Sequence, residues 1–357
     1  MESLVVGQIC NSQLRRWILA VTCALVLAGC SGSSGSNGTL SENMALQGSV
    51  GDGPIINATI TVTDAKRQLI SETVSDLTAG YSLVIPDNTP LPVLVTATGG
   101  TDLVTGRPAE FPLRAIAFSS ETTTLNLTPY TSLAVEMSYC RGKVNEKGMS
   151  EVWEMIDSTY NLGWVTSQSP DPMRDAITPE NVATILLSSE ALGEVFRRSE
   201  QALVGAGAEI TTQEIVRELA CDLKDGAFDG SGQSPMVAAT LLAATVGVQL
   251  ELLSGALHVD DQPVASLLDD ALRTIQPTAD ASVLDVAAPQ TLLAQTIKNL
   301  AALRGIYPDS DFLALELALL EATPDTVAAR LDEVFSTSVR NSLAALAGRI
   351  ALEDSSL

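Results

Sequence analysis

The chain has 357 residues, a formal net charge of −23, 46% hydrophobic residues and a single histidine. This acidity excludes nucleic-acid binding through neutralised phosphates, and one histidine excludes a metal site built from several imidazoles. Aromatic residues make up only 4% of the sequence, which is few for a protein that stacks rings on sugars or binds partners through aromatic hot spots.

The first 29 residues have the pattern of an export signal. Arg15-Arg16 precede an apolar run from Trp17 to Leu27, which is too short to span a bilayer. The run ends in Leu27-Ala28-Gly29-Cys30, which closely resembles the lipobox of bacterial lipoprotein signals. The resemblance implies that residues 1–29 are removed and that a diacylglycerol joins the thiol of Cys30. An ordinary cleaved signal followed by an incidental cysteine is the alternative.

Residues 30–43 predict a flexible tether between the lipid and the folded body. Residues 31–38 contain only Gly, Ser and Asn, so they have no apolar side chain to bury. In the lipoproteins that the signal resembles, an Asp directly after the lipidated cysteine favours the inner membrane, but this chain has Ser31 there. The resemblance therefore implies anchoring to a membrane through Cys30, with the outer membrane, on its periplasmic or cell-surface face, as the expected location.

Residues 44–128 predict an antiparallel β-sandwich of the immunoglobulin or transthyretin type. Residues 58–63 and 81–85 alternate with period two, and residues 93–97 form a mostly apolar run. Several such runs separated by turns are typical of a sandwich. The separating turn formers are Asp52-Gly53-Pro54, Ala79-Gly80, Asp87-Asn88 and Gly99-Gly100.

Three motifs in this region resemble those of the carboxypeptidase-regulatory-like family, a β-sandwich common in secreted bacterial proteins. They are Gly48-Ser49-Val50, the run from Gly53 to Val62, and Gly80-Tyr81-Ser82-Leu83. Residues 125–134 are similar to the link that joins such a sandwich to a helical region in uncharacterised surface lipoproteins. The resemblance covers about a quarter of the chain and implies an accessory module without a peptidase site of its own.

Residues 129–357 predict an all-α domain. A hydroxyl residue followed by Pro predicts a helix start, because Pro at the first helical position loses no hydrogen bond, and Thr211 with Glu214 forms a capping box. The hydroxyl–Pro pairs are Thr128-Pro129, Thr178-Pro179, Ser234-Pro235 and Thr323-Pro324. The expected helices cover residues 129–140, 148–160, 179–203, 212–224, 235–257, 263–275, 289–304, 310–322 and 324–350.

The apolar run from Met236 to Leu257 is nearly long enough to cross a membrane. It contains Gln249 and Glu251 and several small residues. A charge inside the run fits the core helix of a bundle better than a transmembrane helix.

Cys140 and Cys221 remain once Cys10 and Cys23 leave with the signal and Cys30 carries the lipid. In an oxidising envelope we expect them to form a disulfide that closes a loop of about 80 residues. Two separately buried thiols are the alternative.

The sequence contains no recognisable catalytic motif. His258 is the only histidine, and no nucleophile elbow, S-x-x-K, phosphate-binding loop or dinucleotide fingerprint is present. The sequence therefore predicts no catalytic residue, and a satisfied or solvent-facing role for His258. The acidic pairs Asp260-Asp261 and Asp269-Asp270 are the positions where a hydrolase acid and base could be sought.

Asp222, Asp225 and Asp229 lie among glycines at a predicted helix end and are candidate Ca²⁺ ligands. Their spacing does not match an EF-hand loop, so a polar turn that ends the helix is the favoured interpretation. No other cofactor is expected.

Two functions are in contention. The first is a non-catalytic, membrane-anchored envelope lipoprotein that binds or scaffolds an envelope protein or glycan. The second is a polysaccharide-binding protein or a carboxylate-dependent hydrolase of envelope or extracellular glycans. In the second, Trp153, Tyr160 and Trp164 are the rings that could stack on a sugar, although core packing is the favoured interpretation for all three.

Overall fold

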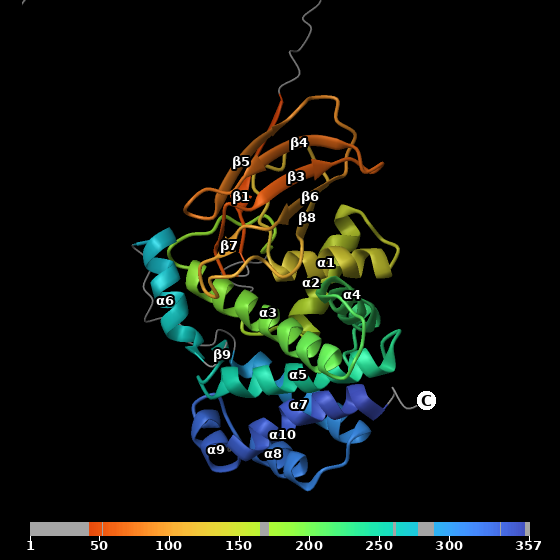
Figure 1. Cartoon of the computed structure of the whole chain (residues 1–357), viewed down its shortest axis with the longest axis vertical. Coiled ribbons are helices and arrows are strands. Elements are labelled where there is room, and N and C mark those ends of the chain that lie inside the picture. Colours follow the sequence, from red (N-terminus) through yellow and green to blue (C-terminus); the bar gives the residue numbers. More distant parts are fainter. Residues whose placement is uncertain are drawn as a thin grey trace, which may run out of the picture. The chain divides into compact units, whose positions relative to one another are not determined.

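The computed structural model describes residues 43–51, 53–164, 171–259, 262–277, 289–335 and 337–353. A β-rich region over residues 44–117 is followed by ten α-helices (Figure 1). The predicted order, an antiparallel β region and then a helical region, is therefore confirmed. Residues 1–42, with the predicted signal and Cys30, lie outside the described residues, as do Asp260 and Asp261.

The strands of the β-rich region pair antiparallel in three groups. One sheet has the order β4-β3-β6-β8, while β1 pairs with β5 and β2 pairs with β7. Buried and more exposed side chains alternate along β3 and β5, as the period-two pattern predicts. The strands are β1 (Met44–Ser49), β2 (Ile55–Ile56), β3 (Thr59–Thr63), β4 (Leu69–Val74), β5 (Gly80–Ile85), β6 (Val93–Thr98), β7 (Thr101–Asp102) and β8 (Leu113–Ala117).

The segment before the first helix runs beside β1. Leu125 donates its N–H to the Gln47 carbonyl at 2.8 Å, and the Tyr81 hydroxyl donates to the Leu125 carbonyl at 2.5 Å. A Cβ atom on Gly48 would lie 2.0 Å from that same carbonyl oxygen. Gly48 is therefore required for the close approach of the two backbones.

Asn126 ties this segment to the chain ahead of the third helix. Its side-chain amide donates to the carbonyls of Pro172 at 3.0 Å and Asp175 at 2.8 Å, and its Oδ1 accepts from the Ser49 hydroxyl at 3.2 Å. The side chain is buried, so each of these bonds satisfies a group that water cannot reach. One amide thus holds β1 and residues 172–175 in fixed relation.

The helices occupy most of the predicted spans. Thr128 and Thr211 are N-caps with capping boxes, and Ser234 is the N-cap of a helix that begins with Pro235. The helices are α1 (Pro129–Cys140), α2 (Glu146–Thr159), α3 (Val182–Gly205), α4 (Thr212–Asp222), α5 (Pro235–Leu253), α6 (Val264–Ile275), α7 (Pro289–Ile306), α8 (Ser310–Leu320), α9 (Val327–Val334) and α10 (Thr337–Glu353). A short hairpin, β9 (His258–Val259) and β10 (Gln262–Pro263), precedes α6.

Two of the predicted helix starts are wrong by about one turn. The N–H of Thr178 donates to Asn181 Oδ1, and α3 begins only at Val182. The N–H of Thr323 donates to Thr326 Oγ1, and α9 begins only at Val327. In both cases a polar side chain three residues later closes a turn that delays the helix.

The helix predicted over residues 324–350 is two helices, so that prediction is wrong. α9 ends at Val334, its C-cap residue Phe335 has a ψ of 63°, and α10 begins at Thr337. α10 packs against α5 and α3, whereas α9 packs mainly against α8. The break therefore lets the apolar residues on the two sides of Phe335 be buried against different neighbours.

α5 is the central helix of the α region and lies between α3 and α10 (Figure 1). It is long and apolar enough to cross a membrane, but 94% of its most apolar window is buried within the described protein. This burial agrees with the prediction of a core helix.

Cys140 at the end of α1 and Cys221 in α4 are joined by a disulfide, with a Cα–Cα distance of 5.3 Å. The bond links two helices that also pack against each other. It closes a loop with a sequence separation of 81 residues, which restricts the unfolded chain.

Candidate functional site

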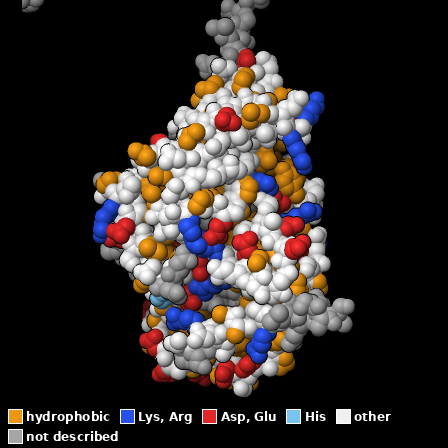
Figure 2. Space-filling view, viewed as in Figure 1, with side chains coloured by type: hydrophobic (Ala, Val, Ile, Leu, Met, Phe, Trp, Pro, Cys, Tyr) orange, Lys and Arg blue, Asp and Glu red, His pale blue; other side chains and the backbone are white. Residues whose placement is uncertain are grey.

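A cleft of about 860 Å³ lies between α3, α5 and α10. Figure 2 shows acidic and basic side chains gathered around a hollow below the strands. The lining residues are Glu194, Arg198, Gln201, Ala202, Ala243, Ala244, Gly247, Glu251, His258, Thr337, Arg340, Asn341, Leu343, Ala344, Ala347 and Gly348. Small residues form much of the wall, and charged residues supply its polar groups.

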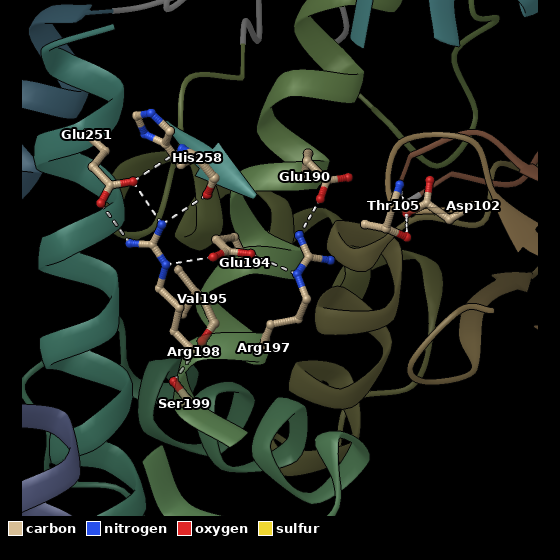
Figure 3. A network of polar contacts seen from close by, with 10 residues as sticks. All are labelled: Asp102, Thr105, Glu190, Glu194, Val195, Arg197, Arg198, Ser199, Glu251 and His258. Atoms are coloured by element: carbon tan, nitrogen blue, oxygen red, sulfur yellow. Dashed lines mark hydrogen bonds and ion pairs between the residues drawn. The ribbon is translucent and has the colours of Figure 1, made fainter. Parts of the chain in front are cut away.

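Arg198 of α3 organises the polar wall of this cleft (Figure 3). Its Nη1 and Nη2 donate to the two carboxylate oxygens of Glu251 at 3.0 and 2.8 Å, and its Nε donates to Glu194 at 2.7 Å. Nη2 also donates to the carbonyl of His258 at 3.1 Å. One planar guanidinium thereby fixes residues from α3, α5 and β9.

Glu194 connects this group to a second ion pair deeper in the protein. Its other carboxylate oxygen accepts a hydrogen bond from Arg197 Nε at 2.8 Å, and Arg197 also pairs with Glu190. The Glu190 side chain is fully buried and the Arg197 side chain is only 4% exposed. The result is an alternating series of charges, Glu190–Arg197–Glu194–Arg198–Glu251, which we call the α3 charge network (Figure 3).

The inner end of the α3 charge network faces the β-rich region. Burial raises the pKa of Glu190 to about 7, although the charge of Arg197 opposes the shift. Burial also raises the pKa of Asp102, whose carboxylate accepts hydrogen bonds from the backbone N–H of Val104 at 2.8 Å and the Thr105 hydroxyl at 2.7 Å. The charge of Asp102 disfavours ionisation of Glu190, and the charge of Arg197 favours ionisation of both carboxyl groups, so the network links α3 electrostatically to β7.

The predicted calcium candidates do not converge on a common point. Asp225 Oδ1 accepts from the N–H of Ala227 and Asp229 Oδ1 from the N–H of Ser231, both at 3.0 Å. Asp222 Oδ2 accepts from the N–H of Gly230 at 3.3 Å, and burial followed by the charge of Asp229 raises the Asp222 pKa to about 7. Among the described residues, no group of three or more His, Cys, Asp or Glu is arranged to hold a metal ion.

Of the other candidate positions, His258 lines the cleft, whereas Asp269 and Asp270 do not. Asp269 and Asp270 both pair with Arg273 on α6, and the Arg273 side chain is 68% exposed. His258 lines the cleft, and its Nδ1 lies within hydrogen-bond distance of the Ala256 carbonyl. The His258 carbonyl accepts a hydrogen bond from Arg198, and the His258 N–H donates one to Glu251. His258 therefore contacts the charged groups of the cleft through its main chain.

Trp153, Tyr160 and Trp164 are buried, as their interpretation as core residues predicts. The two Trp rings meet edge to face with centroids 5.4 Å apart. The Tyr160 hydroxyl lies 2.8 Å from the Thr245 hydroxyl inside the helical core. None of the three lines the cleft in the described part of the chain.

Sequence reasoning missed the cleft itself. Two signals for part of it were present, namely the i, i+4 spacing of Glu190, Glu194 and Arg198 and the single charge of Glu251 within an apolar helix. A carboxylate in such a helix needs a buried partner. The identity of that partner depends on how α3 packs against α5, which the local pattern does not specify.

Comparison with known proteins finds no family model that matches the chain, and no curated protein and no solved structure with significant similarity to it.

The raised pKa values predict that the protein loses stability as the pH rises from about 4.5 to about 7. In this window folded Glu190 and Asp222 hold protons that the unfolded chain has released, so raising the pH favours unfolding. Denaturant unfolding at pH 5 and pH 8 should therefore give a higher stability at pH 5. The contribution of Glu190 should be on the order of 1–3 kcal/mol.

Glu190→Gln should flatten this pH dependence because it removes one buried titrating group, and the raised pKa values of Asp222 and Asp102 should supply what remains. The matched control is Glu154→Gln, at an exposed position of α2, which should leave the slope unchanged. Equal slopes for Glu190→Gln and the parent protein would contradict the assignment.

Proposed function

We propose that the protein is a non-catalytic, membrane-anchored envelope lipoprotein whose helical region binds a ligand in the cleft between α3, α5 and α10. The presence of this cleft is the main support for a binding role. Its volume of about 860 Å³ is within the range of roughly 300–1,000 Å³ that is usual for small-molecule sites. Half of its lining residues are small or aliphatic and half carry polar or charged side chains, so the cleft can contact both an apolar and a polar part of a ligand.

The arrangement of the charges favours binding over hydrolysis. A carboxylate-dependent hydrolase needs an acid and a second carboxylate that face the scissile bond from separate positions. In this cleft Glu194 and Glu251 both accept hydrogen bonds from Arg198. The rings considered for sugar stacking are buried elsewhere, so the glycan hydrolase is the weaker of the two hypotheses.

The β-rich region is proposed to be a sandwich that acts as an accessory module between the anchor and the helical region. Buried apolar residues come from the β1–β5 pair and from the four-stranded sheet, as the two layers of a sandwich require. Leu46 and Leu83 come from the first pair of strands, and Ile60 and Val95 from the second sheet. The carboxypeptidase-regulatory-like resemblance supports the same accessory role.

The anchor is proposed to be a lipid on Cys30, with the outer membrane as the location. Cys30→Ala should abolish incorporation of radiolabelled palmitate and move the protein from the membrane fraction to the soluble fraction of the cell. Cys140→Ala is the matched control, because it removes a cysteine of the folded body and should leave labelling in place. Continued labelling of Cys30→Ala would contradict the proposed lipid site.

Filling the cleft should abolish binding without loss of the fold. A Cβ atom on Gly348 meets no other atom within 4 Å, so Gly348→Leu should be accommodated and should occupy the cleft. The parent protein, immobilised and incubated with an envelope extract of the native cell, should retain a species that mass spectrometry identifies. Gly348→Leu should retain at least about 10-fold less of that species.

Gly305→Leu is the control for the filled cleft. Gly305 also lies in a helix with open space around its Cβ position, but it is exposed on α7 and does not line the cleft. Equal retention by Gly348→Leu and Gly305→Leu would place the binding site elsewhere. No retained species with the parent protein would contradict the binding function.

A further inference from the structure

We propose that the cleft binds a molecule through a single carboxylate group, which pairs with Arg340. This inference rests on the proposed binding function of the cleft and names the chemical class of its ligand. Arg340 lies in the first turn of α10 and lines the cleft. Among the described residues, it is the arginine of the cleft that forms no ion pair with a carboxylate.

The Arg340 guanidinium is held against an aromatic ring but forms no ion pair with a described carboxylate. Its carbon lies 5.0 Å from the centroid of the Phe335 ring, and Phe335 is buried. Stacking on this ring restricts the orientation of the guanidinium before a ligand arrives. The Nε atom is buried without a hydrogen-bond partner, and within the described ranges no carboxylate forms an ion pair with Arg340.

Arg198, in contrast, is already paired with two carboxylates. Four of its five N–H groups donate to Glu194, to Glu251 and to the His258 carbonyl, which leaves one N–H on Nη1. An anion that bound Arg198 through both Nη atoms would have to displace the bidentate pair with Glu251, whose side chain is 4% exposed. Arg340 is therefore the position in the cleft where a new anionic group is stabilised at the lowest cost.

The balance of charge selects a carboxylate over a phosphate. Glu194 and Glu251 line the same cleft as Arg340 and repel an anion that approaches it. A phosphate carries nearly two negative charges, so these carboxylates repel it about twice as strongly as they repel a carboxylate, while Arg340 offers one positive charge in either case. A carboxylate carries one charge and matches the planar donor fork of one arginine.

The rest of the cleft fits a compact apolar body attached to the carboxylate. Ala243, Ala244 and Gly247 of α5 and Ala344, Ala347 and Gly348 of α10 line the cleft beside the place where these two helices pack against each other. These short side chains make this part of the wall apolar. Gln201 and Asn341 add side-chain amides for further hydrogen bonds.

The test uses the purified full chain and two probes that differ in charge but hardly in shape, 4-fluorobenzoate and the neutral 4-fluorobenzamide. Fluorine NMR line broadening follows the binding of each probe down to millimolar affinity. We expect 4-fluorobenzoate to bind at least about 5-fold more tightly than 4-fluorobenzamide. Arg340→Gln should weaken benzoate binding by about 5- to 10-fold and leave the amide unchanged.

Arg349→Gln is the matched control, because Arg349 lies on the same helix, is exposed and does not line the cleft. It makes the same change in net charge and should keep the parent affinity for benzoate. Arg340→Lys should bind at an intermediate level, since it keeps the charge and loses the fork. Thermal unfolding of each variant confirms that it is folded.

The outcomes separate this inference from the proposed function. Equal binding of the two probes, an unchanged benzoate affinity in Arg340→Gln, or no benzoate binding at tens of millimolar would overturn the carboxylate assignment. The proposed cleft would survive those results if Gly348→Leu still abolished retention of the envelope species. Benzoate binding that depends on Arg340 but not on Gly348→Leu would instead overturn the cleft as the site.

Discussion

The guanidinium of Arg198 is the interaction on which the arrangement of the helical region depends. It joins α3 to α5, because it donates hydrogen bonds to Glu194, to both oxygens of Glu251 and to the His258 carbonyl. Glu251 sits in a helix that is otherwise apolar and almost wholly buried. Without Arg198 this carboxylate would be an uncompensated buried charge, which the fold could not hold in place. The bidentate pair therefore sets the rotation of α5 relative to α3, and α10 packs against both helices.

The α3 charge network extends this constraint toward the β-rich region. Buried ion pairs contribute little net stability compared with apolar packing, but they penalise every arrangement in which one partner is lost. Each carboxylate of α3 in this network has a guanidinium beside it, since Glu190 pairs with Arg197 and Glu194 pairs with both Arg197 and Arg198. The network ends at the cleft, where Glu194, Arg198 and Glu251 supply one wall with fixed, ion-paired groups. In this strongly acidic protein, the other charged residues of that wall are ion-paired with each other, which leaves Arg340 to pair with a ligand anion in the proposed site.

Local signals in the sequence predicted much of the fold and none of the cleft. The alternating strands and the caps at Thr128 and Thr211 depend on residues that are close in the sequence, and these elements form where they are expected. The starts at Thr178 and Thr323 are displaced because Asn181 and Thr326 close competing turns. The break at Phe335 has no Pro or Gly to mark it and follows from how α9 and α10 pack on different helices. The cleft joins residues from Glu194 to Gly348, so its geometry arises only from tertiary packing.

A double-mutant cycle between Arg198 and Glu251 tests the central role of this ion pair most directly. The cycle compares the free energies of unfolding of Arg198→Met, Glu251→Gln and the double variant with that of the parent protein. We expect a coupling energy of about 2 kcal/mol or more, because the pair is bidentate and largely buried. The Arg273–Asp270 pair on α6, which is exposed, should give less than about 1 kcal/mol in the same experiment. A coupling energy for Arg198 and Glu251 no larger than that of the exposed pair would contradict the account.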